Sequence, residues 1–156
     1  MFKVKEKKKK WFINKVEVRE STVHIGGHGV FATELIKKHE VFESSPVLTW
    51  HFSFLRDYQK LHDARHILDD HVFLWSNANV AFCLGYGTIY NHSNEPNAMH
   101  RAVHDDKWPR LEFIAKRDIQ PGEEIFHHYS PKAGPLFFTE TGTFDMDDQL
   151  HPWEKR

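Results

Sequence analysis

The chain has 156 residues, of which 40% are hydrophobic and 14% aromatic, and its formal net charge is −1. A chain of this length and composition can bury a core of its own, which excludes wholesale disorder and favours a single globular domain. The one cysteine, Cys83, excludes an internal disulfide framework and a cysteine-cluster zinc site, and no apolar run is long enough for a membrane span or a signal peptide. We therefore expect a soluble intracellular protein, cytoplasmic or nuclear, that makes no membrane contact.

The near-zero net charge hides a basic N-terminus. Residues 1–15 hold seven lysines and one glutamate, a local charge of +6, so the other 141 residues carry −7. A run of this kind is most often a solvated tail, although it can also contact nucleic acid or act as an address. We interpret residues 1–15 as a basic arm, and as the only segment through which nucleic acid would be bound.

After the arm, the chain is predicted to be rich in strands. Apolar and charged residues alternate over 16–20, and three further segments rich in β-branched or aromatic residues follow at 22–25, 30–32 and 41–43. The charged residues 35–40 are typical of a surface turn.

The middle of the chain contains its strongest helix signal. Side chains that suit one helix face recur at spacings of four and three over about residues 52–68, so we predict a helical insert over about 51–70. Further strands are predicted at 71–75, 80–84, 110–115 and 125–129, with a turn over 118–124. Residues 131–156 mix aromatic with acidic residues and are predicted to form a C-terminal cap.

Three short motifs follow one another along the chain. They are Gly27-His28-Gly29, then Asn91-His92-Ser93-Asn94-Glu95-Pro96-Asn97, then Gly122-Glu123-Glu124-Ile125 followed by Tyr129. Taken singly, the glycines could serve a turn with positive φ, the asparagines could cap turns, and the histidine could belong to the core. In this order and spacing, the motifs resemble the GxG, NHSxxPN and GEExxxxY motifs of the SET-domain family of protein-lysine methyltransferases. The resemblance covers about residues 16–130.

The resemblance implies a fold and a reaction. The fold would be mainly β with a short helical insert: a SET-domain fold of small sheets in which the C-terminal strand crosses the Asn-His segment in a pseudoknot-like arrangement. The reaction would be methyl transfer from S-adenosylmethionine, without a metal, to the ε-amine of a lysine in a protein or peptide substrate, for which a histone is one candidate. The chain lacks the cysteine-rich zinc segments of many members and in this is similar to the small viral ones.

The resemblance also assigns site residues. Tyr129 is the expected catalytic residue, because its hydroxyl would orient the amine and help place the methyl group. The expected cofactor-binding residues are Gly27, His28, Gly29, Asn91, His92, Tyr129 and Phe137. The expected substrate-channel residues are His71, Tyr90, His100 and His127. Glycine lets a backbone approach a ligand closely, the Asn91 amide can donate and accept, and a partly dry aromatic channel favours a neutral lysine amine.

Three positions depart from the family pattern toward histidine. His28 stands where a Trp or Tyr usually lies, His127 where a Phe or Tyr often lies two residues before the active tyrosine, and His71 near the channel tyrosine of the viral members. Because imidazole titrates near neutrality, an inactive or retuned module that binds the cofactor or a peptide is the alternative to an enzyme.

A histidine–metal enzyme is a third hypothesis, built from His92, His100, His104, His127 and His128, but no ligand spacing supports it. The sequence leaves open the substrate, the number of methyl groups added and whether the chain forms a homodimer.

Overall fold

The computed structural model describes residues 11–62, 68, 71–76 and 78–129. These residues form mostly strands, together with one α-helix, α1 (Ser53–His62), and the 3-10 turn η2 (Tyr86–Thr88). The strands are β1 (Phe12–Ile13), β2 (Val16–Glu20), β3 (His28–Ala32), β4 (Val41–His51), β5 (Val72–Leu74), β6 (Asn79–Cys83), β7 (Asn91–His92), β8 (Ala98–Val103), β9 (Arg110–Ala115) and β10 (Phe126–His127). The expected fold class, mainly β with a short helical insert, is confirmed.

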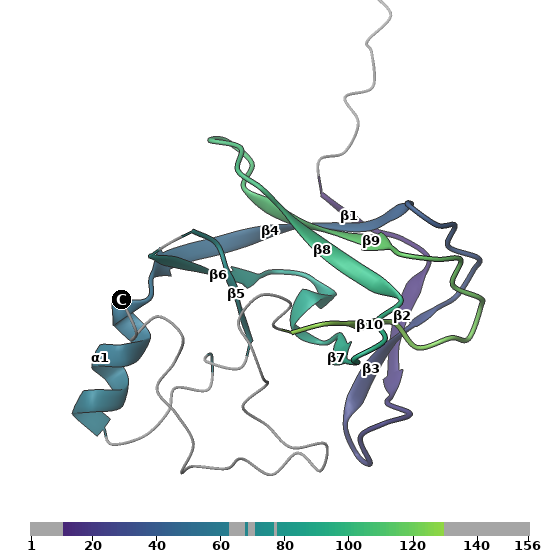
Figure 1. The fold of residues 1–156 in the computed structure, drawn as a ribbon, viewed down its shortest axis with the longest axis horizontal. Helices are drawn as coiled ribbons and strands as arrows, with labels where there is room; N and C mark the ends of the chain where they lie inside the picture. The colour runs from purple at the N-terminus through teal and green to yellow at the C-terminus, as the bar shows by residue number, and fades with distance from the viewer. Residues whose placement is uncertain (1–10, 63–67, 69–70, 77, 130–156) are drawn as a thin grey trace, which may run out of the picture.

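A six-stranded sheet forms the frame of the molecule. Its strand order is β5-β6-β4-β9-β8, with β1 also paired to β4, and two-stranded sheets join β2 to β3 and β10 to β7. The long strand β4 changes partners along its length: residues 41–46 pair with β9, and residues 47–51 pair with β6. In Figure 1, β4 runs along the top of the molecule with β9 and β8 beside it, and β7 and β10 lie beneath.

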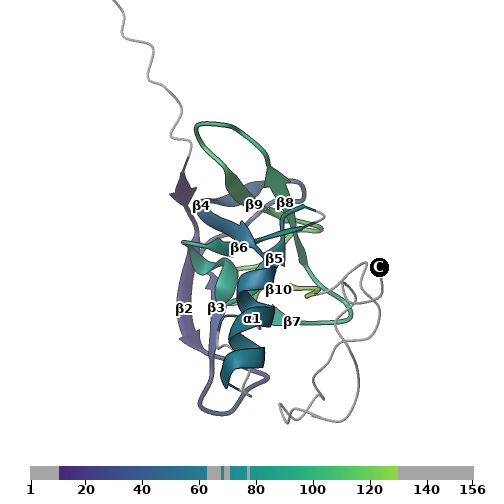
Figure 2. The ribbon, with the colours of Figure 1, turned by 90° about the vertical axis from the view of Figure 1, so that its left-hand side faces the viewer.

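The core lies between this sheet and the smaller pairs of strands. It contains the buried residues Val30, Ile36, Phe42, Tyr90, Leu111, Phe113, Ile119 and Ile125. Strand β9 is buried from Leu111 to Ala115, which places it at the centre of the sheet with both faces covered. Figure 1 shows α1 at one end of the molecule and the β2–β3 pair at the other, with β7 and β10 between them, and Figure 2 shows the molecule from the α1 end.

Most predicted elements agree with the structure, and one does not. Strands at 16–20 and 110–115 are confirmed, and the strand expected at 41–43 continues to His51. The strand predicted over 22–25 is wrong, because this segment is a loop. The hydroxyl of Ser21 accepts hydrogen bonds from the backbone N–H groups of Val23 and His24 at 3.1 and 3.3 Å, and so closes a turn that replaces strand pairing.

The helix was predicted longer than its described part. It begins at Ser53, as expected, while residues 63–67 and 69–70 of the predicted insert lie outside the described residues, as does the predicted cap over 131–156. No helix in the described ranges has the length and apolar character that a membrane crossing requires.

The end of the predicted basic arm belongs to the sheet. Phe12 and Ile13 pair with Ser44 and Glu43 of β4, and the ring of Trp11 packs edge-on against that of Trp108, 4.8 Å between centroids. The segment from residue 11 to 15 is therefore structural, because its apolar residues extend the sheet.

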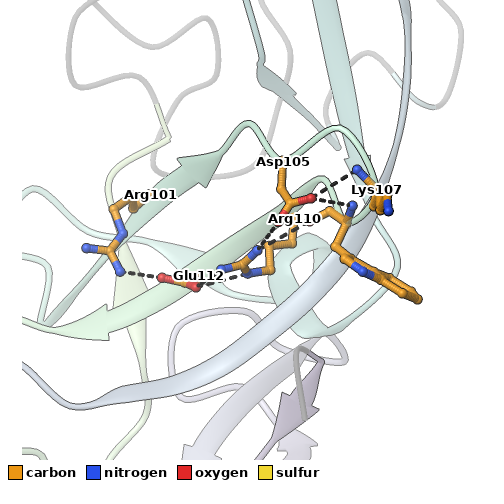
Figure 3. Close-up of polar contacts among 6 residues, drawn as sticks. Arg101, Asp105, Lys107, Arg110 and Glu112 are labelled. Atoms are coloured by element: carbon orange, nitrogen blue, oxygen red, sulfur yellow. Dashed lines mark hydrogen bonds and ion pairs between the residues drawn. The ribbon is translucent and has the colours of Figure 1, made fainter. Parts of the chain in front are cut away.

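Strand β8 was not predicted, and charged pairs join it to β9. Figure 3 shows the carboxylate of Glu112 between Arg101 and Arg110, with Asp105 on the other side of Arg110. Burial by itself would raise the pKa of Glu112, but hydrogen bonds from the two arginines outweigh it and lower the pKa. The hairpin is thus fixed by a largely buried carboxylate that stays ionised.

Candidate active site

The second and third motifs meet through a parallel pair of short strands. Phe126 and His127 of β10 pair with Asn91 and His92 of β7, although 35 residues separate each pair in the sequence. Asn97, the last residue of the second motif, fixes this crossing. Its Nδ2 donates to the carbonyl of Glu124 at 2.8 Å, and its Oδ1 accepts from the Phe126 backbone N–H at 2.8 Å. The C-terminal crossing beside the Asn-His segment is therefore present.

The β2–β3 loop, which leads into the first motif, is joined to the other two motifs by the carboxylate of Glu124. Its Oε1 accepts from Ser21 Oγ at 3.0 Å and from Asn91 Nδ2 at 2.8 Å, and its Oε2 accepts from the Thr22 backbone N–H at 2.8 Å and from the Thr22 hydroxyl. Burial alone would raise the pKa of Glu124, but these donors overcome burial and the pKa is lowered. The carboxylate holds β7 and the β2–β3 loop in one place.

Gly29 is required by this junction. A Cβ built on it would lie 2.1 Å from Glu124 Oε1 and 3.3 Å from Asn91 Nδ2, so any larger residue would displace the carboxylate. Neither Gly27 nor Gly29 has a positive φ. Among the described glycines, only Gly26 and Gly122 do. Close packing within the protein therefore explains the second glycine of the GxG motif without a turn.

The amide of Asn91 is occupied by the protein. Its Nδ2 lies 3.0 Å from Ser21 Oγ, 2.9 Å from the His28 carbonyl oxygen and 2.8 Å from Glu124 Oε1. Two N–H groups thus face three acceptors, so this nitrogen serves the fold. Cofactor binding by Asn91 stays a prediction, and it would have to use the amide oxygen or the backbone.

His92 orients the segment that carries Tyr129. Its Nδ1 accepts from the Tyr129 backbone N–H at 3.2 Å, which leaves the proton on Nε2, 3.2 Å from Asn94 Oδ1. Burial lowers the pKa of His92, so the neutral ring is favoured. The side chain of Tyr129 is 38% exposed, and its hydroxyl donates to the carbonyl oxygen of Tyr90 at 2.9 Å. The predicted catalytic hydroxyl thus lies beside a backbone carbonyl at the surface of the site.

Aromatic and imidazole rings pack behind Tyr129 around His127. The His127 ring lies 4.9 Å from that of Tyr129, 5.7 Å from His100 and 5.7 Å from Phe73, on which it stacks. His127 is 3% exposed, and its Nδ1 has no hydrogen-bond partner among the described residues. Burial, followed by the nearby His100, lowers the pKa of His127 to about 3. This ring is therefore neutral at physiological pH and presents an unpaired nitrogen inside the cluster.

The structure brings together only some of the predicted channel residues. His100 and His127 belong to the ring cluster, and burial lowers the pKa of His100 as well. Tyr90 lies in the core, 1% exposed, and contacts the cluster from behind. The side chain of His71 is exposed at the start of β5, and Phe137 lies outside the described residues.

Sequence reasoning missed Phe73 and Glu43. Phe73 has the stacking contact to His127, and Glu43 accepts a hydrogen bond from the Tyr90 hydroxyl. Nothing local in the sequence marks either residue, since each owes its place to a contact across the fold.

The histidines do not assemble a metal centre in the described part of the chain. No group of three or more His, Cys, Asp or Glu side chains there is arranged to hold a metal ion. His104, included in the metal hypothesis, packs against the ring of Trp75 at 4.3 Å.

Comparison with protein families matches residues 27–130, more than half of the chain, to the SET domain. The chain belongs to the SET-domain family. A histone-lysine N-methyltransferase of Schizosaccharomyces pombe, specific for H3 lysine 37, is 29% identical over 103 residues, which is 66% of each chain. This SET-domain chain thus spans just under two thirds of the length of that curated relative.

Solved structures share the fold of this SET domain. A Plasmodium falciparum protein solved as a candidate histone methyltransferase is 27% identical, covers 78% of this chain and 97% of its own, and has a TM-score of 0.61. Polycomb Repressive Complex 2 of Chaetomium thermophilum, solved with S-adenosylmethionine bound, is 20% identical, with coverage of 76% of this chain and 15% of its own and a TM-score of 0.61. The second likeness shows the fold alone.

SET methyltransferases use S-adenosylmethionine, and the residues around Tyr129 fit that cofactor. A sulfonium is tolerated by carbonyl oxygens and uncharged rings. The Tyr90 carbonyl lies at the Tyr129 hydroxyl, and the neighbouring His92 and His127 rings favour the neutral form. The site therefore presents oxygen acceptors and uncharged rings to a sulfonium, and these two imidazoles carry no charge that would repel it.

Proposed function

We propose that this SET domain is a protein-lysine N-methyltransferase that takes its methyl group from S-adenosylmethionine. The observation that supports this most directly is the position of Tyr129. Its hydroxyl is fixed on the Tyr90 carbonyl at 2.9 Å, next to a cluster of neutral rings and beside the pairing of β7 with β10.

The chemistry is an in-line displacement. When bound, S-adenosylmethionine would supply an electrophilic methyl group to the lone pair of the lysine ε-amine, with S-adenosylhomocysteine as the leaving product. A free lysine has a pKa near ~10.4 and is almost wholly protonated at neutral pH, so the site must favour its neutral form. The rings of His127, Phe73 and His100 do this by excluding water, because desolvation penalises the ammonium. The proton released from the amine passes to solvent.

Tyr129 contributes by positioning more than by proton transfer. A hydroxyl that donates to the Tyr90 carbonyl keeps its oxygen lone pairs available for the N–H groups of the incoming amine. His127 lies deeper, with its ring 4.9 Å from that of Tyr129 and with a buried Nδ1 that has no hydrogen-bond partner among the described residues. In this proposal, His127 limits how many methyl groups the lysine amine can carry, and His92 orients the backbone of Tyr129.

The relatives direct the choice of substrate. The Schizosaccharomyces pombe relative acts on histone H3, so histones are the first substrates to test, and a nuclear location would follow from that substrate. Cofactor contacts by Gly27, His28, Gly29 and Phe137, and channel contacts by His71 and Tyr90, belong to the same proposal.

The experiment is incubation of the purified protein with labelled S-adenosylmethionine and a panel of histones and lysate proteins. We expect label on lysine, and a rise in melting temperature with S-adenosylhomocysteine, because a ligand that binds only the folded state stabilises it. A melting shift without transfer to any substrate would favour the alternative, a retuned binding module. No shift and no transfer would contradict both.

A further inference from the structure

A buried carboxylate lies behind Tyr90. Glu43 of β4 is 0% exposed, and its Oε2 accepts from the Tyr90 hydroxyl at 2.5 Å while its Oε1 accepts from Ser45 Oγ at 2.6 Å. It forms no ion pair with any residue that the structure describes. A buried carboxylate without a cation is costly to the fold unless hydrogen bonds satisfy it.

The local chain is shaped around this carboxylate. A Cβ on Gly85 would lie 2.0 Å from Ser45 Oγ and 2.2 Å from Glu43 Oε1, so only glycine lets the backbone pass here. The backbone N–H groups of Tyr86 and Gly87 also donate to Glu43. Backbone N–H groups of the Gly85-Tyr86-Gly87 segment thus supply hydrogen bonds to the buried carboxylate.

Tyr90 connects this buried cluster to Tyr129. Its ring is enclosed between Phe42 and Phe113, with centroid distances of 6.1 and 4.7 Å. One end of Tyr90, the hydroxyl, is held by Glu43, and the other, the backbone carbonyl, accepts the Tyr129 hydroxyl at 2.9 Å. Since Tyr129 is 38% exposed, burial alone does not fix its hydroxyl, and the position of the Tyr90 carbonyl matters.

We propose that Glu43 is a positioning residue for Tyr129 and acts through Tyr90. Glu43 holds the Tyr90 side chain, and this fixes the Tyr90 backbone carbonyl. That carbonyl accepts the Tyr129 hydroxyl and so positions it where it would bind the lysine amine. This inference rests on the proposed methyltransferase function.

The protonation of the pair is consistent with this role. Burial, and after it the adjacent Glu43, raises the pKa of Tyr90 well above its ordinary value, so the phenol keeps its proton and remains a donor. Burial also raises the pKa of Glu43, against the effect of its hydrogen bonds from Ser45 and Tyr90.

A double-mutant cycle tests the connection. Tyr90→Phe removes the anchored hydroxyl and keeps the carbonyl, and we expect kcat to fall about tenfold with KM and the S-adenosylhomocysteine melting shift unchanged. In the Tyr129→Phe background, the same substitution should have no further effect on kcat, because the hydroxyl to be positioned is gone. Equal losses in both backgrounds would overturn the proposal.

A matched pair of substitutions separates positioning from stability. Glu43→Gln and Glu112→Gln each neutralise a buried carboxylate on neighbouring strands, and Glu112 contacts the hairpin arginines of Figure 3 but not Tyr90. Both should lower the melting temperature, and only Glu43→Gln should lower kcat. A similar fall in kcat for both variants would show that Glu43 acts through stability alone.

A spectroscopic measurement does not depend on turnover. The chain has four tyrosines, so fluorine NMR of protein labelled with 3-fluorotyrosine gives few resonances, and Tyr129→Phe assigns one of them. Glu43→Gln should move the Tyr129 resonance and Glu112→Gln should not. An unmoved resonance would refute the positioning role even if no substrate were found, whereas a moved resonance in a protein that methylates nothing would leave the structural link intact and refute the proposed function.

Discussion

Tyr129 is held by two hydrogen bonds more than by burial. Its backbone N–H donates to His92 Nδ1 at 3.2 Å and its hydroxyl donates to the Tyr90 carbonyl at 2.9 Å. Both partners come from the Asn-His segment, so the position of the hydroxyl depends on the pairing of β7 with β10. The residue that would carry the chemistry is therefore placed by its neighbours.

Tyr129→Phe should keep the fold and the cofactor affinity nearly unchanged, since only one oxygen is removed. Loss of a positioned hydrogen bond in a partly dry site typically costs a few kcal/mol of transition-state stabilisation, so we expect turnover to fall roughly a hundredfold or more. Single-turnover kinetics on a peptide, with melting curves in S-adenosylhomocysteine as the control for binding, measure both. Full activity in this variant would rule out the mechanism.

His127→Phe should leave the enzyme active and change the proportions of mono-, di- and trimethyl product, because in the proposed site the imidazole would set the room around the amine. Mass spectrometry of a methylated peptide measures the product. His104→Phe is the matched control, since His104 packs on Trp75 away from Tyr129 and should leave the proportions as they are. Unchanged proportions in His127→Phe would remove this residue from the channel.

His127 also predicts how stability depends on pH. Its folded pKa of about 3 lies below the ordinary value of 6.5, so the unfolded chain binds a proton first as the pH falls. The stability that the neutral ring contributes is present above about pH 6.5 and is lost as the pH falls toward 3. Urea unfolding at several pH values should show a weaker decline for His127→Phe than for the wild type, and parallel declines would contradict the burial of a neutral ring.

At the level of elements, Glu124 joins the β2–β3 loop to β7. The carboxylate receives four donors from Ser21, Thr22 and Asn91, and Gly29 leaves the room that it needs. The loop that was predicted to be a strand is thus a set of donors for a residue about a hundred positions later in the chain.

Glu124→Gln should lower the free energy of unfolding by about 2 kcal/mol, the scale of hydrogen bonds to a charged group. The NH2 group of the glutamine would face N–H and O–H groups that now donate to the carboxylate. The pKa of Glu124 is depressed, so its contribution is present above the ordinary carboxyl value of 4.5 and is lost as the pH falls through the folded value. Acid titration of the melting temperature should be flatter in this range for Glu124→Gln.

The neighbouring substitution Glu123→Gln is the control. Glu123 pairs with Arg117 in a contact whose side chains are 27% and 56% exposed, and ion pairs open to solvent in this way contribute less to stability than the buried Glu124 junction. Equal losses of unfolding free energy in the two variants would show that the Glu124 carboxylate contributes no more to stability than an exposed ion pair.

At the level of the whole molecule, the basic N-terminus adjoins the sheet at a point away from the Asn-His segment. Trp11 packs on Trp108 of the β8–β9 hairpin, and Phe12 pairs with Ser44. Figure 1 shows β1 on the upper side of the molecule and β7 and β10 below it. The described chain therefore begins on the side of the molecule opposite β7 and β10.

Removal of residues 1–10 should leave methylation of a short free peptide within about twofold of the full chain, because these residues precede the family match. Binding to a substrate on nucleic acid should weaken and lose part of its salt dependence, since fewer lysines displace counterions. A variant with Lys7–Lys10 replaced by Gln keeps the length and should behave like the truncation on nucleic acid. Loss of activity on the free peptide would contradict this division of roles.

The sequence by itself determined the family, the motifs and the elements with a strong local pattern. Strands β2 and β9 and the start of α1 follow from the spacing of apolar residues, which depends on neighbours a few positions away. The resemblance carried by the three motifs was enough to predict Tyr129 as the catalytic residue and a pseudoknot-like crossing of the C-terminal strand beside Asn91 and His92.

Only the tertiary structure decided what the polar residues of these motifs do. The hydrogen bond from Thr22 to Glu124, the occupied amide of Asn91 and the link from Glu43 through Tyr90 to Tyr129 all depend on partners 33 to 102 positions apart. No local pattern encodes such pairs, because a buried polar group is stable only where the fold supplies its partner, and that partner can come from any part of the chain.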